Sequence, residues 1–347
     1  MNRALLIRAD ASTEIGAGHV MRTFALGQAW QRRGGRVVYA AASMPPSLAE
    51  QLASTGFSLE HINSPSGSPA DCRETLSIAA ANHVPGLVAD GYCFGADWQK
   101  SIKETGLPLT ILDDYGHADY YWADLIVNQN LEADPALYHH RNSGTRLLLG
   151  TSYTLLREEF TAHDPKLRQA PAIARRILVT LGGSDGENVS AKVVQALTAG
   201  MSSDIEVRLI VGGSNPHREM LRSMIASVDY PCELFVDAKR MSEHMAWAEL
   251  AVSAAGSTAW ELAFMSVPMI LIVTSENQRA IGRRLAEAEA AVDLGAFGML
   301  RQETIAAEVA GLCASGEKRR SLIQNARKLC DGQGAMRVAA AIDELCK

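Results

Sequence analysis

Short apolar runs alternate with amphipathic segments along almost the whole chain, and this alternation constrains the fold more than any other feature. Each apolar run has the length of one buried strand, and the segments between the runs show the periodicity of a helix. Strands and helices that alternate in this way predict a parallel sheet with helices on both faces. In the first half the expected strands are residues 4–7, 36–41, 58–62, 86–89, 109–112, 125–127 and 146–149.

The alternation lapses over residues 161–174, which are polar and include Pro165 and Pro171, so we interpret them as a linker. It then restarts, with strands expected at residues 177–181, 206–211, 233–236, 251–253 and 269–273. The sequence thus predicts an α/β protein of two doubly wound, Rossmann-like domains, residues 1–165 and 174–347. Open sheets of this kind bind ligands beyond the carboxyl ends of their strands, so we expect the domains to face a central cleft.

Composition narrows the class of protein. At 347 residues the chain exceeds what one core usually supports, and its formal charge of −6 argues against nucleic acid as a partner. No apolar run reaches transmembrane length, and Arg3, Arg8 and Asp10 interrupt the first one before it could form a signal peptide. The six cysteines show no Cys-x-x-Cys pair and no zinc spacing. We expect a cytoplasmic protein without membrane insertion.

The stretch from residue 7 to 22 predicts a strand, a glycine loop and a helix. Gly16 and Gly18 allow a close backbone approach or a positive φ at this turn, and the helix that follows offers unpaired N–H groups to an anion. His19 would lie in the first helical turn, where an imidazole can act as a base near neutral pH. The alternative is that His19 is only a polar, half-buried residue at the sheet edge.

A second cluster of small residues, Gly256, Ser257 and Thr258, follows an expected strand and begins a helix, which suits a phosphate group. Glu261 has two interpretations. The pattern Thr258-x-x-Glu261 matches a capping box, in which the carboxylate only satisfies a backbone N–H. Alternatively, the carboxylate accepts hydrogen bonds from the two ribose hydroxyls of a nucleotide.

Two further polar groups follow strands of the second half. Gly183 and Ser184 form a turn on the phosphate side, or else Ser184 or Asp185 simply caps the next helix. Asn277 and Gln278 follow the strand that ends at residue 273, where site residues are expected, although surface polarity explains these amides equally well.

Acidic residues end two strands of the first half. Asp113 and Asp114 are adjacent and point to opposite faces of a strand, so they do not by themselves form a metal chelate; one of them braces a loop or binds a substrate hydroxyl. Asp90 is followed closely by Tyr92, which would orient His19 by a hydrogen bond or else be an ordinary half-buried tyrosine. No Gly-x-Ser-x-Gly elbow is present.

These motifs together resemble the UDP-sugar hydrolases of pseudaminic acid biosynthesis, which act on UDP-2,4-diacetamido-2,4,6-trideoxy-β-L-altropyranose and are relatives of GT-B glycosyltransferases such as MurG. The resemblance spans nearly the whole chain, and the motifs occur in the same order. They are residues 8–10, 15–22, 90–92, 113–114, 128–130, 156–160, 182–185 and 253–258, followed by Glu261, Asn277 and Gln278.

The resemblance implies a GT-B fold and a metal-independent, cofactor-free hydrolase in which water attacks the anomeric carbon with inversion and UDP leaves. It implies that His19 is the general base, that Tyr92 supports it and that Glu261 binds the ribose. A glycosyltransferase that uses the same donor, or a non-catalytic nucleotide-sugar binding protein, is the alternative. We expect a monomer, with substrate contacts at Asp10, Gly16, Gly18, Arg22, Asp114, Gly183, Ser184, Gly256, Ser257, Thr258, Glu261, Asn277 and Gln278.

Overall fold

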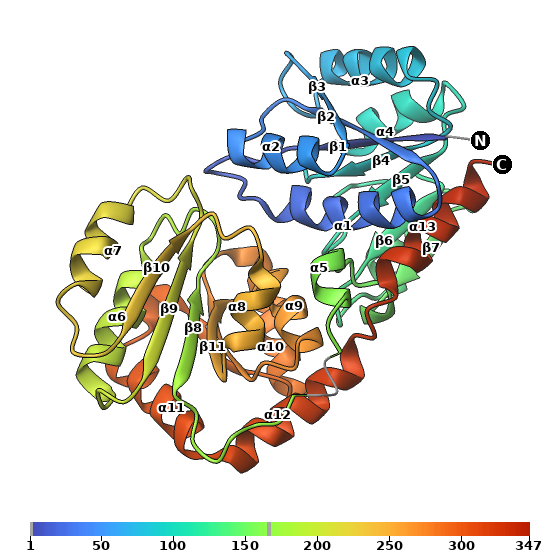
Figure 1. Ribbon diagram of the computed structural model, residues 1–347. Helices are drawn as coiled ribbons and strands as arrows, with labels where there is room; N and C mark the ends of the chain where they lie inside the picture. Colours follow the sequence, from blue (N-terminus) through green and yellow to red (C-terminus); the bar gives the residue numbers. More distant parts are fainter. Residues whose placement is uncertain (1–2, 165–167) are drawn as a thin grey trace. The chain divides into compact units, whose positions relative to one another are not determined.

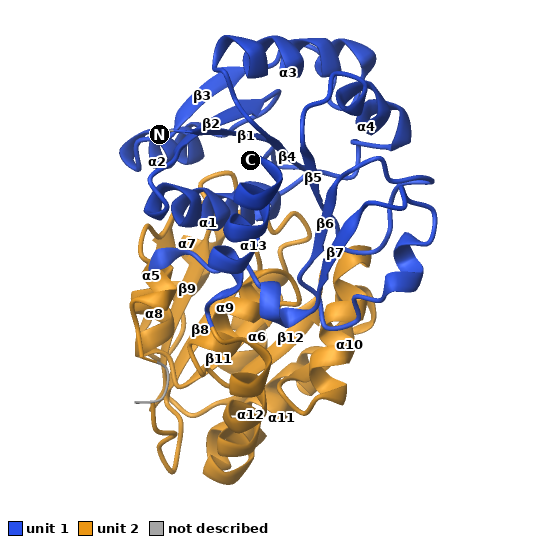
Figure 2. Ribbon diagram, turned by 90° about the vertical axis from the view of Figure 1, so that its right-hand side faces the viewer, with its two compact units in different colours: residues 1–158, 332–347 blue, residues 159–331 orange. Residues whose placement is uncertain are grey.

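The computed structural model describes residues 3–164 and 168–347, which divide into two units that each contain one parallel sheet (Figures 1 and 2). The first unit comprises the chain up to residue 158 together with residues 332–347, and the second comprises residues 159–331. Residue 1 and Pro165, the two ends of the predicted first domain, lie outside the described residues.

The first sheet has seven strands in the order β3-β2-β1-β4-β5-β6-β7, and all neighbours are parallel. These strands are β1 (Ala4–Ala9), β2 (Arg36–Ala41), β3 (Ser58–His61), β4 (Leu87–Asp90), β5 (Leu109–Leu112), β6 (Leu125–Asn128) and β7 (Arg146–Leu149). The helices are α1 (Gly18–Arg32), α2 (Pro46–Ser54), α3 (Pro69–Ala81), α4 (Ala96–Lys103) and α13 (Gly334–Leu345), with single 3-10 turns η1 (Pro135–Tyr138) and η2 (Thr151–Tyr153). The chain passes from the first unit to the second within helix α5 (Glu158–Thr161), after its first residue.

Alternate residues of β1 enter two different cores, because successive strand side chains point to opposite faces of a sheet. Leu5 and Ile7 pack with α1 and α13, whereas Leu6 packs on the other face with residues of α3 and α4 such as Trp98. Both faces of this sheet are therefore covered, as a continuous apolar strand in a parallel sheet requires.

The second sheet has six parallel strands in the order β10-β9-β8-β11-β12-β13. They are β8 (Arg176–Thr180), β9 (Glu206–Val211), β10 (Cys232–Val236), β11 (Leu250–Ala254), β12 (Met269–Val273) and β13 (Val292–Ala296). The helices are α6 (Val189–Gly200), α7 (Arg218–Ile225), α8 (Met241–Trp247), α9 (Thr258–Phe264), α10 (Arg279–Glu287), α11 (Gln302–Ala314) and α12 (Gly316–Leu329), with short turns η4 (Glu276–Gln278) and η5 (Phe297–Met299).

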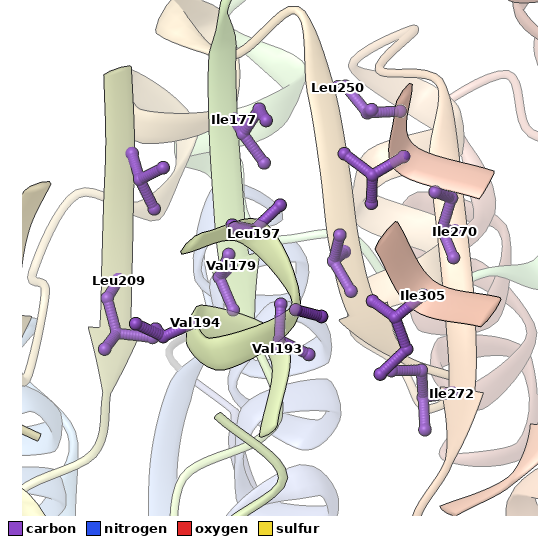
Figure 3. Packing of buried hydrophobic residues seen from close by; sticks show 14 of the residues in the cluster. Ile177, Val179, Val193, Val194, Leu197, Leu209, Leu250, Ile270, Ile272 and Ile305 are labelled. Atoms are coloured by element: carbon purple, nitrogen blue, oxygen red, sulfur yellow. The ribbon is translucent and has the colours of Figure 1, made fainter. Parts of the chain in front are cut away.

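The core of the second unit lies between its sheet and helices α6 and α11 (Figure 3). Val193, Val194 and Leu197 of α6 meet Val179 of β8, and Ile305 of α11 packs in the same cluster. These aliphatic side chains are almost completely buried, and burial of each is worth roughly 1.5–3 kcal/mol.

The C-terminal helix corrects the predicted extent of the second domain. We expected residues 174–347 to form one domain, but α13 groups with the first unit, as the colouring of Figure 2 shows. Val338, Ala339 and Ile342 of α13 enter the core that α1 covers. An amphipathic pattern predicts that a helix covers some apolar surface, but it does not indicate which sheet supplies that surface.

In each sheet the order of the strands reverses between two neighbouring strands, and the loops that follow these two strands are equivalent in the two units. In the first sheet this point lies between β1 and β4, and in the second it lies between β8 and β11. Ligands of doubly wound sheets bind at this position. Within residues 3–164 and 168–347, none of the helices has the length and apolar character needed to cross a bilayer.

Candidate active site

A tight loop joins β1 to α1 and brings His19 to the start of that helix. Gly16 has a φ of +79°, and its N–H donates to the carbonyl of Ser12 at 2.9 Å, while the Ser12 hydroxyl accepts from the backbone of Ile15 at 3.1 Å. The predicted need for a glycine with positive φ is confirmed at Gly16, whereas Gly18 is simply the first residue of α1. The N-cap residue Ala17 makes no side-chain capping bond, and the first turn contains no acidic residue.

His19 is held by a buried carboxylate at the end of β4. Its Nδ1 lies 2.6 Å from Oδ1 of Asp90, and 11% of the His19 side chain is exposed. A carboxylate at Nδ1 favours the tautomer that donates from Nδ1, which leaves a lone pair on Nε2. The arrangement is a histidine whose second nitrogen can take a proton, oriented by an acid.

Arg22, one turn further along α1, links two carboxylates. It donates to both oxygens of Asp90, from Nε at 2.6 Å and from an Nη at 2.7 Å, and its other Nη donates to Asp114 at 2.7 Å. Its guanidinium also lies 3.4 Å from Nδ1 of His19. Arg22 was predicted to contact substrate, but the structure places it beneath His19, where it holds the two acids.

Asp114 is the second acid of this group, and we predicted it as a substrate contact. It accepts hydrogen bonds from Arg22, from the Tyr92 hydroxyl at 2.7 Å and from the Asn130 amide at 2.8 Å. Tyr92 was expected to orient His19 by a hydrogen bond, but Asp90 makes that bond. The Tyr92 ring instead meets the His19 ring edge-on, with centroids 5.0 Å apart.

The electrostatics of the cluster keep both acids ionised. Burial alone would raise the pKa of Asp90, but the charges of Arg22 and His19, with their hydrogen bonds, hold it below its ordinary value. The pKa of Asp114 is also lowered: its burial is outweighed by the charge and hydrogen bond of Arg22 and by the bond from Tyr92. A buried carboxylate pair around one guanidinium is therefore charged at neutral pH.

Asp113 braces the loop that follows β5, which was one of the two roles expected for this acid pair. Its oxygens accept from the backbone N–H groups of Tyr115 at 2.7 Å and Gly116 at 2.8 Å, and from Nδ1 of His117 at 2.8 Å. Burial would raise its pKa, but the bonds and charge of His117 lower it. Asp113 thus fixes the loop beside Tyr92.

Asp10, which we predicted as a substrate contact, belongs to a different buried network. Its carboxylate accepts from Arg8 at 2.7 Å, from the backbone of Ala42 at 2.7 Å and from the Ser66 hydroxyl at 2.7 Å. Arg8 is completely buried and also donates to Asp71 at 2.6 Å. The oxygens of Asp10 are therefore already engaged, and Asp10 joins β1 to two neighbouring loops; its predicted contact with substrate stays a prediction.

The turn after β8 contains a helix cap, as one of the two interpretations predicted. The carboxylate of Asp185 accepts from the N–H groups of Val189 at 2.8 Å and Ser190 at 3.0 Å, which begin α6. Burial raises the pKa of Asp185. Gly183 is exposed and Ser184 is half-buried, so these two predicted contacts remain at the surface of the turn.

The loop after β11 leads directly into α9. The helix begins at Thr258 with Ser257 as its N-cap residue, and Ser257 makes no side-chain capping bond. Thr258 is therefore inside the helix, so the pattern Thr258-x-x-Glu261 is out of register for a capping box. Gly256, Ser257, Thr258 and Glu261 are all partly exposed.

Gln278 and Gly256 lie close together at the ends of β12 and β11. The Gln278 amide nitrogen is 3.6 Å from the point where a Cβ on Gly256 would lie, and its Oε1 accepts from the N–H of Thr274 at 3.0 Å. Asn277 is exposed, and its Oδ1 accepts from the Ser275 hydroxyl at 2.6 Å. Of this predicted pair, the structure thus brings Gln278 beside the glycine loop.

Asp90 and Asn130 belong to the sequence motifs at residues 90–92 and 128–130, but we had assigned neither of them to the site. Both follow apolar strand residues, which is the available signal, and both turn out to contact the cluster around Arg22 and Asp114. Among the described residues, no group of three or more His, Cys, Asp and Glu side chains is arranged to hold a metal ion.

Comparison with known proteins finds relatives of this chain. Residues 176–338 match the model of the glycosyltransferase family 28 C-terminal domain. A spore coat polysaccharide biosynthesis protein, SpsG of Bacillus subtilis, is 28% identical over 256 residues, which is 72% of this chain and 74% of the relative. The UDP-2,4-diacetamido-2,4,6-trideoxy-beta-L-altropyranose hydrolase of Campylobacter jejuni is 24% identical over 285 residues, 82% of this chain and 96% of the relative.

A solved structure gives the fold. MurG of Acinetobacter baumannii superposes with a TM-score of 0.65 at 13% identity, with coverage of 99% of this chain and 100% of that chain. The predicted fold class is confirmed by the two parallel sheets and by this likeness. The chain therefore has the GT-B fold of two Rossmann-like domains, and the domain that follows residue 175 matches the C-terminal domain model of glycosyltransferase family 28.

Proposed function

We propose that the protein hydrolyses a UDP-linked 2,4-diacetamido-2,4,6-trideoxy sugar to UDP and the free sugar. The single observation that carries the chemistry is the contact of 2.6 Å between His19 Nδ1 and Asp90, which gives an oriented base at the start of a helix. The similarity to the Campylobacter jejuni hydrolase supplies the substrate class.

In the proposed reaction His19 removes a proton from water as the water oxygen attacks the anomeric carbon. The new C–O bond forms on the face opposite the leaving group, the bond from the anomeric carbon to the phosphate oxygen breaks, and its electron pair leaves with UDP. The configuration is inverted. General-base assistance of this kind is typically worth a hundredfold or more, and the charge that remains on Asp90 stabilises the imidazolium that forms.

The second unit supplies the proposed nucleotide site. Backbone N–H groups around Gly256 and Ser257 would receive the diphosphate, and the Glu261 carboxylate would accept from the ribose hydroxyls. The support is the match of this region to a glycosyltransferase C-terminal domain, together with the exposed glycine turn after β8 and the partly exposed one after β11. Preorganised N–H groups stabilise the charge that develops on departing UDP.

The test is product analysis with the UDP-sugar as the only substrate. We expect release of UDP and free sugar in equal amounts, with inverted configuration at the anomeric carbon. Turnover is expected to be unchanged by EDTA, because the scheme assigns no step to a divalent ion. A strict requirement for an acceptor would instead establish a glycosyltransferase, the alternative that the family 28 match favours.

Bound substrate without any product, with or without acceptors, would indicate a non-catalytic binding protein.

A further inference from the structure

Two large apolar side chains are exposed at one edge of the first unit. Ile15 and Tyr115 are each 49% exposed, and among the described residues of this unit no other large apolar side chain is classed as exposed. Ile15 lies in the loop before α1, four residues ahead of His19, and Tyr115 follows β5. Isolated exposed apolar residues are common, but here both lie on loops at the carboxyl edge where His19 lies.

An aromatic surface connects His19 to Tyr115. The ring of Tyr92 lies 5.0 Å from the His19 ring and 4.9 Å from the Tyr115 ring, measured between centroids. His117 extends the cluster, with its ring 5.8 Å from Tyr92. The surface therefore begins at the proposed base and ends at a half-exposed tyrosine.

Carboxylates hold this surface in place. The Tyr92 hydroxyl donates to Asp114 at 2.7 Å, and the backbone of Tyr115 donates to Asp113, which also accepts from His117. Groups that are fixed before a ligand arrives lose little conformational freedom when it binds. The rings of Tyr92, Tyr115 and His117 are thus held in place before a ligand binds, and we call them, with Ile15, the apolar wall.

We propose that Tyr115, with Ile15, contacts the methyl groups of the substrate sugar and thereby selects N-acetylated deoxy sugars over hydroxylated ones. This inference rests on the proposed function, since it concerns the sugar placed beside His19. A 2,4-diacetamido-2,4,6-trideoxy sugar presents three methyl groups, two on acetamido substituents and one at C6. A hexose with hydroxyls at these positions would lose water from those hydroxyls against an apolar wall, which is unfavourable.

The test measures binding, so that it does not depend on turnover. Dissociation constants of UDP, UDP-glucose and the UDP-diacetamido-trideoxy sugar are determined by calorimetry for the His19→Ala protein, in which hydrolysis is suppressed. Adding Tyr115→Ala should raise the dissociation constant of the UDP-diacetamido sugar about tenfold, the size of one good aromatic contact. The dissociation constants of UDP and UDP-glucose should change by less than twofold. Tyr115→Phe should retain tight binding, and Ile15→Ala should weaken binding of the diacetamido sugar about fourfold, the size of one buried methylene.

Ile173→Ala is the matched control, because Ile173 is an exposed aliphatic residue of the second unit. It should leave all three constants unchanged. If Tyr115→Ala weakens the binding of all three ligands equally, or of none, the inference is overturned even if the protein is a hydrolase. Conversely, selective weakening in a protein that releases no free sugar would support the wall and reject the hydrolase.

Discussion

The two units place very different residues at the same position of the same fold. At the crossover point of the first sheet, between β1 and β4, a buried network of charges surrounds Arg22, with Asp90 and Asp114 as its acids. At the equivalent point of the second sheet, between β8 and β11, the loops at residues 181–188 and 255–257 are rich in glycine and serine. The first edge holds a network of charged side chains, whereas the second is lined by small residues that would let a ligand approach the backbone.

This difference fits the two proposed roles, orientation of the base by the first unit and binding of the diphosphate by the second. A histidine that acts as a base needs a fixed tautomer and orientation, and a buried carboxylate supplies both. A diphosphate needs N–H groups and a close backbone approach, which small residues allow. The comparison therefore predicts that substitutions in the first unit change turnover and that substitutions in the second change affinity for UDP.

The largest expected effect is that of His19→Ala. Removal of the proposed base should lower turnover by at least ~100-fold, while the affinity for UDP stays within a few-fold, because the proposed UDP site belongs to the other unit. Turnover is measured by UDP release and affinity by calorimetry. His139→Ala is the control, since His139 is an exposed histidine of the same unit whose ring bonds to the nearby carbonyl of Ala136 and lies against the ring of His140. Unchanged turnover in the His19 variant would remove the proposed base.

Asp90→Asn should have the next largest effect. The variant keeps the size of the side chain but removes the charge that holds Nδ1 of His19, so we expect turnover to fall by roughly tenfold to a hundredfold with little change in KM. Asp71→Asn is a matched control, because Asp71 is equally buried and pairs with Arg8. Both variants should lose stability in thermal unfolding, since each leaves an arginine undercompensated.

If Asp71→Asn lowers turnover as much as Asp90→Asn does, the effect is a general loss of stability and the orienting role is rejected.

Glu261→Gln should have a smaller effect, and on affinity alone. Gln keeps one acceptor oxygen but loses the charge and the second bond to the ribose, so binding of UDP should weaken about tenfold, the size of one charge-assisted bond of about 1.5 kcal/mol. The decisive comparison is between UDP and 2′-deoxy-UDP. The native protein should prefer UDP, and Glu261→Gln should lose that preference. An unchanged preference would show that Glu261 does not contact the ribose.

Much of the fold follows from local sequence, because strand and helix periodicities are properties of short segments. The exceptions are informative. Strand β13 was missed, since Asp293 and Gly295 interrupt its apolar pattern and its pairing with β12 includes a register shift. The position of α13 was wrong because the surface that it covers belongs to α1, about 310 residues earlier in the chain.

The site was predictable as a region but not as a set of contacts. Polar residues at strand ends indicated the edge at which His19, Arg22 and Asp114 come together, but the partner of His19 depends on sheet register. Asp90 reaches it because β1 and β4 pair with Ala9 opposite Asp90. The network around Asp10 was missed for the same reason, since its partners Arg8 and Ser66 come together only in the folded unit.

Acidification should distinguish the carboxyl edge of the first sheet from the start of α6 in the second unit, with the smallest effect of the series. The pKa values of Asp90, Asp113 and Asp114 are lowered in the folded protein. At pH values above the ordinary pKa of aspartate, each ionised carboxylate therefore stabilises the first unit. This contribution is lost as the pH falls through the lower pKa of the folded protein. Asp185 in the second unit has the opposite sign: burial raises its pKa, so its ionisation opposes folding at neutral pH and lowering the pH relieves that cost.

Hydrogen exchange measures this difference, once the rates are corrected for the intrinsic effect of pH. Between about pH 6 and pH 4 the start of α6 should keep or gain protection, whereas below about pH 4, near the ordinary pKa of aspartate, peptides that contain β4 and β5 should lose it first. Asp90→Asn removes one of the titrating groups, so its loss of protection should depend less steeply on pH. Equal loss across both units would show that the charged edge does not determine the acid stability of the first.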